Sequence, residues 1–240
     1  MAGRRAERGV AALSTALRHS HCSGKLSRVL EAVFFDWSNT LVHFEWDDAL
    51  VEGGHRAALG RDDPEFTARW RELMLGDAHG RRPYPELLAE LGVADPDAFI
   101  DAEHEAWRPA YSVLSMAPAL LESLRERGLK TALVADPWPD PARVLMGDVE
   151  RLGFAPLLDA VVLGDDNLAR ACAELDVAPL AVLFVGDSLA DVQRAADVGM
   201  TSAQALWFKA DDIPEIEPDF EAFTAVDVVS IVRRLARSPQ

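Results

Sequence analysis

Cysteine is scarce in this chain, and long apolar stretches are absent. Of its 240 residues only Cys22 and Cys172 are cysteines, and their contexts match no metal-binding or redox spacing. Structural disulfides are therefore not expected, and the chain is predicted to work in a reducing, cytoplasmic compartment. No apolar run approaches the roughly 20 residues that are needed to cross a bilayer. We therefore expect no membrane partner.

Basic side chains are also scarce once the first 30 residues are set aside. Of the 24 Lys and Arg residues six lie in residues 1–30, together with one of the 40 Asp and Glu residues. The rest of the chain thus carries 18 basic and 39 acidic side chains, a net charge of −21. This field repels polyanions, so nucleic acid is not an expected partner. A small phosphate ester can still be attracted through a bound cation.

Residues 1–30 form a basic segment that is rich in Ala, Arg and Ser and nearly free of acids. Organelle transit peptides share this composition, but basic tails of this kind also arise easily from composition alone. The segment lacks the apolar core of a secretory signal. We interpret it as a disordered extension, or as the product of an upstream start codon, rather than as a targeting signal.

Four short apolar runs are typical of buried β-strands. Each is nearly continuous rather than alternating, as expected for strands that are covered on both faces; they span residues 32–35, 131–134, 160–163 and 181–185. Helix patterns that end at Gly lie between them, at 118–127, 141–152 and 188–198. A weaker strand at 202–207 and a closing helix at 225–236 complete the pattern. The alternation predicts an α/β fold with a doubly wound parallel sheet.

Residues 43–115 interrupt this alternation directly after the first strand. They show only helix patterns, broken by Gly and Pro, at 49–59, 64–75, 85–91 and 96–111. We interpret the interruption as a small all-helical cap domain, which leaves residues 31–42 and 116–240 as the core. An insertion at this point would lie over the carboxyl ends of the strands, where open α/β sheets bind ligands.

Acidic residues follow two of the predicted strands. Asp36 ends the first strand, and the run Gly186-Asp187-Ser188-Leu189-Ala190-Asp191 follows the fourth. A carboxylate in such a place can act as a nucleophile or a metal ligand, and Asp187 and Asp191 can present two oxygens to a hard cation from one helix turn. Taken singly, each also fits a plain structural role, as a turn residue or as a helix cap. Their combination favours a shared acidic site.

In these motifs and their order, residues 31–240 resemble the haloacid dehalogenase superfamily. The shared features are a strand followed by Asp-x-x-x-Thr-Leu, a helical cap, a strand at the second motif, and a strand followed by Gly-Asp-Ser-x-x-x-Asp. The resemblance implies a Rossmann-like core and a hydrolase acting on a small phosphorylated substrate. It implies Asp36 as the nucleophile that accepts the phosphoryl group, and Mg²⁺ held by Asp36, Asp187, Asp191 and the Ser38 carbonyl.

Further contacts to the phosphate or the substrate are expected from four polar residues near these motifs, namely Thr40, Asp136, Arg170 and Ser188. A divalent cation is needed in such chemistry because a carboxylate that attacks a phosphate dianion meets like-charge repulsion. Oligomeric state has no signal in the sequence.

Three departures from the family pattern bear on the rate of turnover. Ser38 stands where phosphatases of the family have a second Asp, which protonates the leaving group and later activates water. Ala135 replaces the Ser or Thr of the second motif, and no Lys lies between Lys130 and Lys209 to serve as the third-motif lysine. Arg170 is the only cation near that motif, and a solvated helix position is its ordinary role.

Three functions remain open at this stage. The first is a magnesium-dependent phosphohydrolase that is slow or restricted to good leaving groups, because a lost acid or base costs about 10²–10⁴ in rate. The second is a degenerate relative that binds Mg²⁺ or phosphate as a regulatory or interaction module. The third, suggested by the resemblance of Asp36-Trp37-Ser38 to phosphonoacetaldehyde hydrolases, is carbon–phosphorus bond hydrolysis; it is disfavoured because residues 43–115 contain no Lys for a Schiff base. Haloacid dehalogenation is disfavoured as well. Enzymes of that subgroup need no metal, whereas the Gly-Asp-Ser-x-x-x-Asp run of the metal-binding type is intact in this chain.

Overall fold

The computed structural model describes residues 29–45, 47–77, 82–137, 139–208 and 217–237. The predicted basic extension therefore lies almost wholly outside the described residues. Within those ranges no helix combines the length and the apolar character that a membrane span requires. Cys172, the cysteine in the described part of the chain, is buried and unpaired with another cysteine.

A six-stranded parallel sheet forms the core. Its strand order is β5-β4-β1-β6-β7-β8, so the first strand lies at the centre, flanked by β4 and β6. The strands are β1 (Ala32–Phe35), β4 (Lys130–Ala135), β5 (Ala160–Leu163), β6 (Val182–Gly186), β7 (Thr201–Ala205) and β8 (Phe220–Ala222). The predicted doubly wound parallel sheet is confirmed, and β8, which has only three residues, is an addition to the predicted set.

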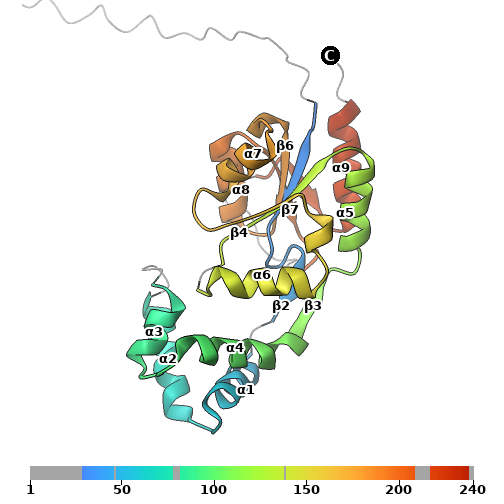
Figure 1. Cartoon of the computed structure of the whole chain (residues 1–240). Helices are drawn as coiled ribbons and strands as arrows, with labels where there is room; N and C mark the ends of the chain where they lie inside the picture. The colour runs from blue at the N-terminus through green and yellow to red at the C-terminus, as the bar shows by residue number, and fades with distance from the viewer. Residues whose placement is uncertain (1–28, 46, 78–81, 138, 209–216, 238–240) are drawn as a thin grey trace, which may run out of the picture.

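Helices cover both faces of this sheet. Figure 1 shows α7 and α8 on one side of it and α5 and α9 on the other. Alternate residues of each strand pack into separate cores: Phe34 lies in the core under α7, and Phe35 lies in the core under α5 and α9. This two-sided burial explains why the strands read as continuous apolar runs. The helices are α5 (Ala117–Glu126), α6 (Ala142–Arg151), α7 (Asn167–Leu175), α8 (Leu189–Val198) and α9 (Ala225–Arg237).

The insertion after β1 contains four helices with a core of their own. Buried Trp70, Tyr84, Leu88 and Ile100 belong to that core. Figure 1 shows these helices at one end of the molecule, with α6 between them and the sheet. They are α1 (Asp48–Leu59), α2 (Pro64–Asp77), α3 (Tyr84–Glu90) and α4 (Pro96–Trp107). We call this helical insertion the cap.

A two-stranded antiparallel sheet joins the cap to the core. It pairs β2 (Val42–Phe44) with β3 (Tyr111–Val113); no strand was predicted at either position, and only Tyr111 lay in a predicted helix. The helix that was predicted to run to Tyr111 ends at Trp107, because Pro109 has no backbone N–H and restricts the residue before it. Short 3₁₀ turns follow at Arg108–Ala110 and occur again at Ala155–Leu157 and Pro179–Ala181.

The loop that follows β4 carries the polar contacts between cap and core. His104 of α4 lies 3.2 Å from Asp140 of this loop, and the backbone N–H of Tyr84 donates to the carbonyl of Pro139 at 3.2 Å. Arg143, at the start of α6, donates to Asp97 of α4 at 2.7 Å. The loop after β4 and the start of α6 therefore both contact the cap helices α3 and α4.

Candidate active site at the carboxyl end of the sheet

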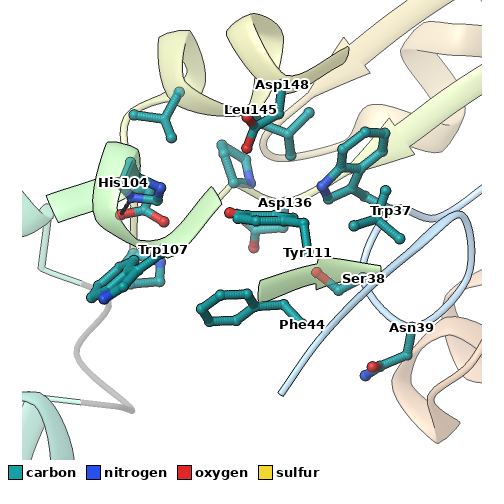
Figure 2. Close-up of a pocket in the computed structure, with 15 residues that line it drawn as sticks. Trp37, Ser38, Asn39, Phe44, His104, Trp107, Tyr111, Asp136, Leu145 and Asp148 are labelled. Carbon is teal, nitrogen blue, oxygen red and sulfur yellow. Dashed lines mark ion pairs between the residues drawn. The ribbon is translucent and has the colours of Figure 1, made fainter. Parts of the chain in front are cut away.

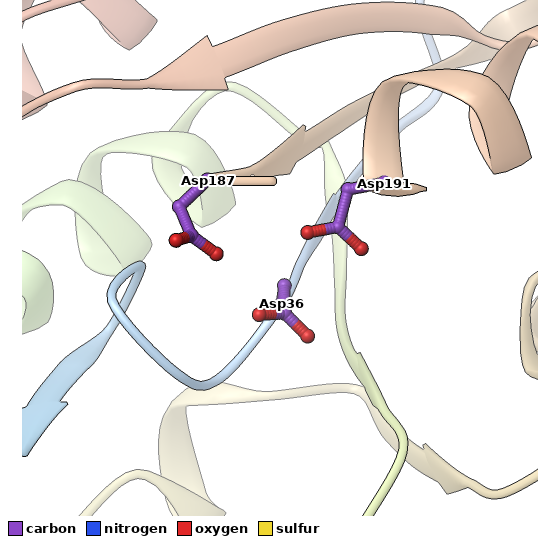
Figure 3. Close-up of side chains that lie close together, drawn as sticks. All are labelled: Asp36, Asp187 and Asp191. Carbon is purple, nitrogen blue, oxygen red and sulfur yellow. The ribbon is translucent and has the colours of Figure 1, made fainter. Parts of the chain in front are cut away.

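Three aspartates meet at the carboxyl ends of the two central strands. Asp36 follows β1, Asp187 follows β6, and Asp191 lies in the first turn of α8. One carboxylate oxygen of each lies within 4.8 Å of the others, and Figure 3 shows the three side chains directed toward a common space. The backbone N–H of Asp36 donates to Val185 at 2.9 Å, which extends the pairing of the two strands to the site. We call these residues the carboxylate cluster.

Helix α8 begins with a cap that orients Asp191. The Ser188 hydroxyl accepts from the Asp191 N–H at 3.1 Å and donates to the Asp191 Oδ2 at 2.7 Å. The Ser188 N–H also donates to this Oδ2, at 3.2 Å. This reciprocal capping box satisfies the free donors of the helix start. Ser188 and Asp191 thus cap helix α8, and the same bonds orient the Asp191 carboxylate in the cluster.

Gly186 lets Asp191 approach the end of β6. A Cβ at position 186 would lie 2.7 Å from the Cβ of Asp191 and 2.8 Å from its carboxylate carbon and Oδ2. Side-chain atoms do not come that close without displacement. A glycine is therefore required here for close approach between the strand end and the carboxylate.

Asp187 is supported from the neighbouring strand by Gln204. This residue of β7 is fully buried, pairs in register with Gly186, and donates through its Nε2 to the backbone carbonyl of Asp187 at 3.1 Å. A buried amide is costly unless it is hydrogen-bonded, and the other residues of β7 are small. Gln204 could have been noticed in the sequence, because it is a long polar residue near the end of a strand of small residues.

The electrostatics of the cluster favour a bound cation. Burial raises the pKa of Asp36 well above its ordinary value, and repulsion from Asp191 and Asp187 raises it further. The backbone N–H of Trp37 and the guanidinium of Arg194 act in the opposite direction. Three close carboxylates are the oxygen ligands that Mg²⁺ prefers. The three carboxylates, which approach within 4.8 Å of one another, therefore fit such an ion as a donor set.

The segment after Asp36 folds back as a tight loop. Asn39 has a positive φ of 54°, and its Oδ1 lies 2.8 Å from the Nδ1 of His43. Ser38 is exposed, whereas Thr40 is fully buried and accepts through its carbonyl from the indole N–H of Trp207 at 2.9 Å. Thus Ser38 faces solvent beside the cluster, and Thr40 anchors the loop to the segment after β7.

A cavity of about 260 Å³ lies between this loop and the cap. Figure 2 shows aromatic and acidic side chains around it, from the core and from α4 and β3. Its lining includes Trp37, Ser38, Phe44, His104, Trp107, Tyr111, Asp136, Asp140 and Asp148. Asp136 is the one predicted contact residue in this lining, and Ser38, whose carbonyl is a predicted metal ligand, also lines the cavity.

The third-motif region is short in the structure. Only Gly164, Asp165 and Asp166 separate β5 from α7, and Asp166 has a positive φ of 51°. The exposed Arg170 turns back toward this loop and donates to the carbonyl of Leu163 at 3.0 Å. Its contact with a phosphate, like that of Ser188, stays a prediction. This connection contains no lysine.

Arg194 is the site residue that the sequence reasoning missed most clearly. It lies three residues after Asp191 on α8, and its Nη1 is 3.6 Å from the Asp191 Oδ1. Helix geometry places residues i and i+3 on one face. The spacing of three residues from Asp191 could therefore have indicated in the sequence that Arg194 lies beside the site.

Comparison with known proteins agrees with this geometry. The sequence model of the haloacid dehalogenase-like hydrolases matches residues 30–199. The chain is 28% identical over 189 residues to an N-acetylmuramic acid 6-phosphate phosphatase of Pseudomonas aeruginosa, which covers 72% of this chain and 80% of the relative. It is 24% identical over 223 residues to a phosphoglycolate phosphatase of Synechococcus elongatus, covering 87% and 100% of the two chains.

A solved structure of similar fold is a haloacid dehalogenase-type phosphatase from Thermococcus onnurineus. The TM-score is 0.64 at 22% identity, over 84% of this chain and 97% of the other. The family match covers strands β1, β4, β5 and β6 and the three residues of the carboxylate cluster. This chain belongs to the haloacid dehalogenase-like hydrolases.

Proposed function

We propose that this hydrolase is a magnesium-dependent phosphatase that acts on a small phosphorylated metabolite through Asp36. The carboxylate cluster carries the proposal, because carboxylate oxygens of Asp36, Asp187 and Asp191 lie within 4.8 Å of one another at the carboxyl ends of β1 and β6. The phosphatase names of the two relatives support the reaction class. Asp36, Asp187, Asp191 and the Ser38 carbonyl would hold Mg²⁺, which offsets the charge of the phosphate and of the cluster.

In this reaction an oxygen of Asp36 attacks phosphorus, and the bond between phosphorus and the ester oxygen breaks. The phosphoryl group is then carried on Asp36 as an acyl phosphate, and a water molecule attacks it to release inorganic phosphate and the free carboxylate. The rigid strand β1 holds Asp36 for in-line attack. Thr40, Asp136, Arg170 and Ser188 are proposed phosphate or substrate contacts, and the cap–core cavity receives the leaving group.

Ser38 limits both halves of this reaction. A serine hydroxyl is a poor general acid and base, so the leaving alkoxide must take its proton from solvent or be stable without one. The attacking water likewise lacks a carboxylate partner at this position. We therefore expect good leaving groups to react faster than alkyl phosphates, and the phosphorylated enzyme to be long-lived.

The decisive experiment measures hydrolysis of an aryl phosphate by the purified full chain, with Mg²⁺ and with EDTA. Asp36→Asn should abolish hydrolysis, whereas Asp197→Asn, an exposed acid on α8, should leave it unchanged. Acid quenching during turnover should trap radiolabelled phosphate on the wild type and not on Asp36→Asn. Turnover that persists in Asp36→Asn would reject the proposal.

A regulatory or interaction module is the second candidate, and the three-residue connection between β5 and α7 is the observation that favours it. Such a protein would bind Mg²⁺ or phosphate without Asp36-dependent hydrolysis. Measurable Asp36-dependent release of phosphate excludes it. A cytoplasmic location and the absence of nucleic-acid partners stay predictions from composition.

A further inference from the structure

The guanidinium of Arg194 is held in a defined place beside the carboxylate cluster. Its Nη2 donates to the Oδ1 of Asn167 at 3.1 Å, and its Nη1 lies 3.6 Å from the Oδ1 of Asp191. Its central carbon lies 5.8 Å from the centre of the Phe184 ring. Contacts with three elements, α7, α8 and β6, thus restrict this side chain, although 36% of it remains exposed.

Asn167 connects Arg194 to the region where the third-motif lysine is missing. It is the first residue of α7, is 4% exposed, and follows the short connection from β5. A buried amide needs a partner, and the guanidinium of Arg194 supplies one. The side chain therefore bridges the start of α7 and the metal-ligand helix α8.

The two oxygens of Asp191 have separate partners. Oδ2 accepts from Ser188, whereas Oδ1 is the oxygen nearest to Arg194. The positive charge is also close to Asp36, because Arg194 lies 3.6 Å from Asp191 and carboxylate oxygens of Asp191 and Asp36 lie within 4.8 Å of each other. The charge of Arg194 thus acts on two of the three aspartates, Asp191 and Asp36.

We propose that Arg194 supplies, from α8, the positive charge that the absent third-motif lysine would have supplied to the nucleophile and the phosphate. The inference rests on the proposed phosphatase function. Arg194 acts on the reacting groups through its field and through Asp191, so it is a positioning residue rather than a group that exchanges protons. The site would then differ from the family pattern in two related ways. The connection between β5 and α7 is short and has no lysine, and helix α8 carries the cation instead.

This role predicts effects of opposite sign on the two ligands of the site. A cation beside the cluster repels Mg²⁺ and attracts phosphate. A residue that merely anchored α8 to α7 would, when removed, weaken the binding of both ligands. The sign of the change in Mg²⁺ affinity therefore distinguishes an electrostatic role from a structural one.

The experiment uses the full chain with Arg194→Met, Arg194→Lys and, as a matched control, Arg125→Met on the exposed surface of α5. Calorimetry gives the Kd of Mg²⁺ alone, and of inorganic phosphate at saturating Mg²⁺. Steady-state kinetics with an aryl phosphate gives kcat and KM separately. Arg194→Met should raise the Kd of phosphate about tenfold and leave that of Mg²⁺ unchanged or lower.

The kinetic loss should be moderate. We expect kcat/KM of Arg194→Met to fall by about 10- to 100-fold, below the 10²–10³-fold cost of a fully buried donor, because solvent screens a partly exposed charge. Arg194→Lys should recover part of this loss, and Arg125→Met should match the wild type. Equal weakening of Mg²⁺ and phosphate, or unchanged phosphate affinity in Arg194→Met, would overturn the inference.

Failure of the proposed function is separable from failure of this inference. A wild type that binds phosphate but shows no Asp36-dependent hydrolysis would reject the phosphatase, and the binding measurements would still decide the role of Arg194. An Arg194→Met variant that hydrolyses the ester as well as the wild type does would reject the role of Arg194 alone. A wild type that binds no phosphate at saturating Mg²⁺ would reject both.

Discussion

The imidazole of His104 lies 3.2 Å from the carboxylate of Asp140, across the boundary between cap helix α4 and the core. His104 is buried and lines the cap–core cavity together with Asp140. The pair therefore links the position of the cap to the place where the leaving group would bind. We therefore expect a change in the charge of His104 or Asp140 to alter both the position of the cap and the place where the leaving group would bind.

The first prediction concerns the pH dependence of this link. Burial lowers the pKa of His104, but Asp140, Glu103 and Asp148 outweigh burial and raise it above its ordinary value of 6.5. The folded state thus binds the proton more tightly than the unfolded state does, so the stabilisation is complete below pH 6.5 and is lost as the pH rises through the folded pKa. His104→Gln should cost about 1–3 kcal/mol of unfolding free energy at pH 6 and less at pH 9.

Urea unfolding of the wild type, His104→Gln, Asp140→Asn and the double variant gives the coupling energy of the pair at each pH. This coupling should be present at pH 6 and should diminish by pH 9. A coupling that is equal at both values would show that the histidine stays neutral.

The second prediction concerns the close approach at Gly186. In Gly186→Ala the new Cβ would collide with Asp191, at 2.7 Å from its Cβ, and the carboxylate must move away from the other two. We expect the Kd of Mg²⁺ to rise by about tenfold or more, as 1.4 kcal/mol of displacement energy implies. Calorimetric titration with Mg²⁺ measures this, with Gly53→Ala, where no atom lies within 4 Å of the new Cβ, as the control. Unaltered affinity would mean that Asp191 is not a ligand.

The third prediction uses two adjacent glycines in α1 that differ in their surroundings. A Cβ at Gly54 would lie 2.3 Å from the indole nitrogen of Trp107, whereas a Cβ at Gly53 meets nothing within 4 Å. Gly54→Ala should destabilise the protein by about 1–3 kcal/mol through overpacking, and Gly53→Ala should stabilise it by about 0.5–1 kcal/mol. Thermal and urea unfolding compare the two. Equal stability of both variants would show that the indole is free to move.

The fourth prediction concerns the missing proton carrier. Ser38→Asp places a carboxylate at the cavity beside Asp36, where it can protonate the leaving group and activate water. Dephosphorylation of the trapped phosphoenzyme should accelerate by about tenfold or more, within the 10²–10⁴ range of general acid–base catalysis. Rapid-quench measurement of label loss tests this, with Ser38→Asn as the uncharged control. A lifetime equal in both variants would place the limiting step elsewhere.

The fold could be predicted from the sequence because its strands are short, apolar on both faces and separated by helices with clear ends. The run at 160–163 matches β5, and the closing helix expected at 225–236 matches α9 within one residue. The pair β2–β3 could not be predicted, since three-residue strands carry no period that distinguishes them from a helix end. Their pairing depends on residues 67 or more positions apart.

The candidate site was predictable only in part, for a physical reason. Asp36, Asp187 and Asp191 each occupy a recognisable place at the end of a strand or in the first turn of a helix. Arg194, Gln204 and Asn167 act through contacts between elements, and a chain position gives no information on which element packs beside it. The cation expected from the third motif was therefore sought near Arg170, on α7, whereas Arg194 of α8 lies 3.6 Å from Asp191.

The central position of β1 in the sheet has a consequence for folding. Asp36 and Asp187 are brought together only when β1 pairs with β6, so a loop of about 150 residues must close before the cluster exists. A nascent chain that lacks β6 has no such site, and Mg²⁺ cannot stabilise it. The proposed metal site would in this way be a property of the native topology, and Mg²⁺ bound there would favour the folded molecule over forms in which β1 and β6 are not paired.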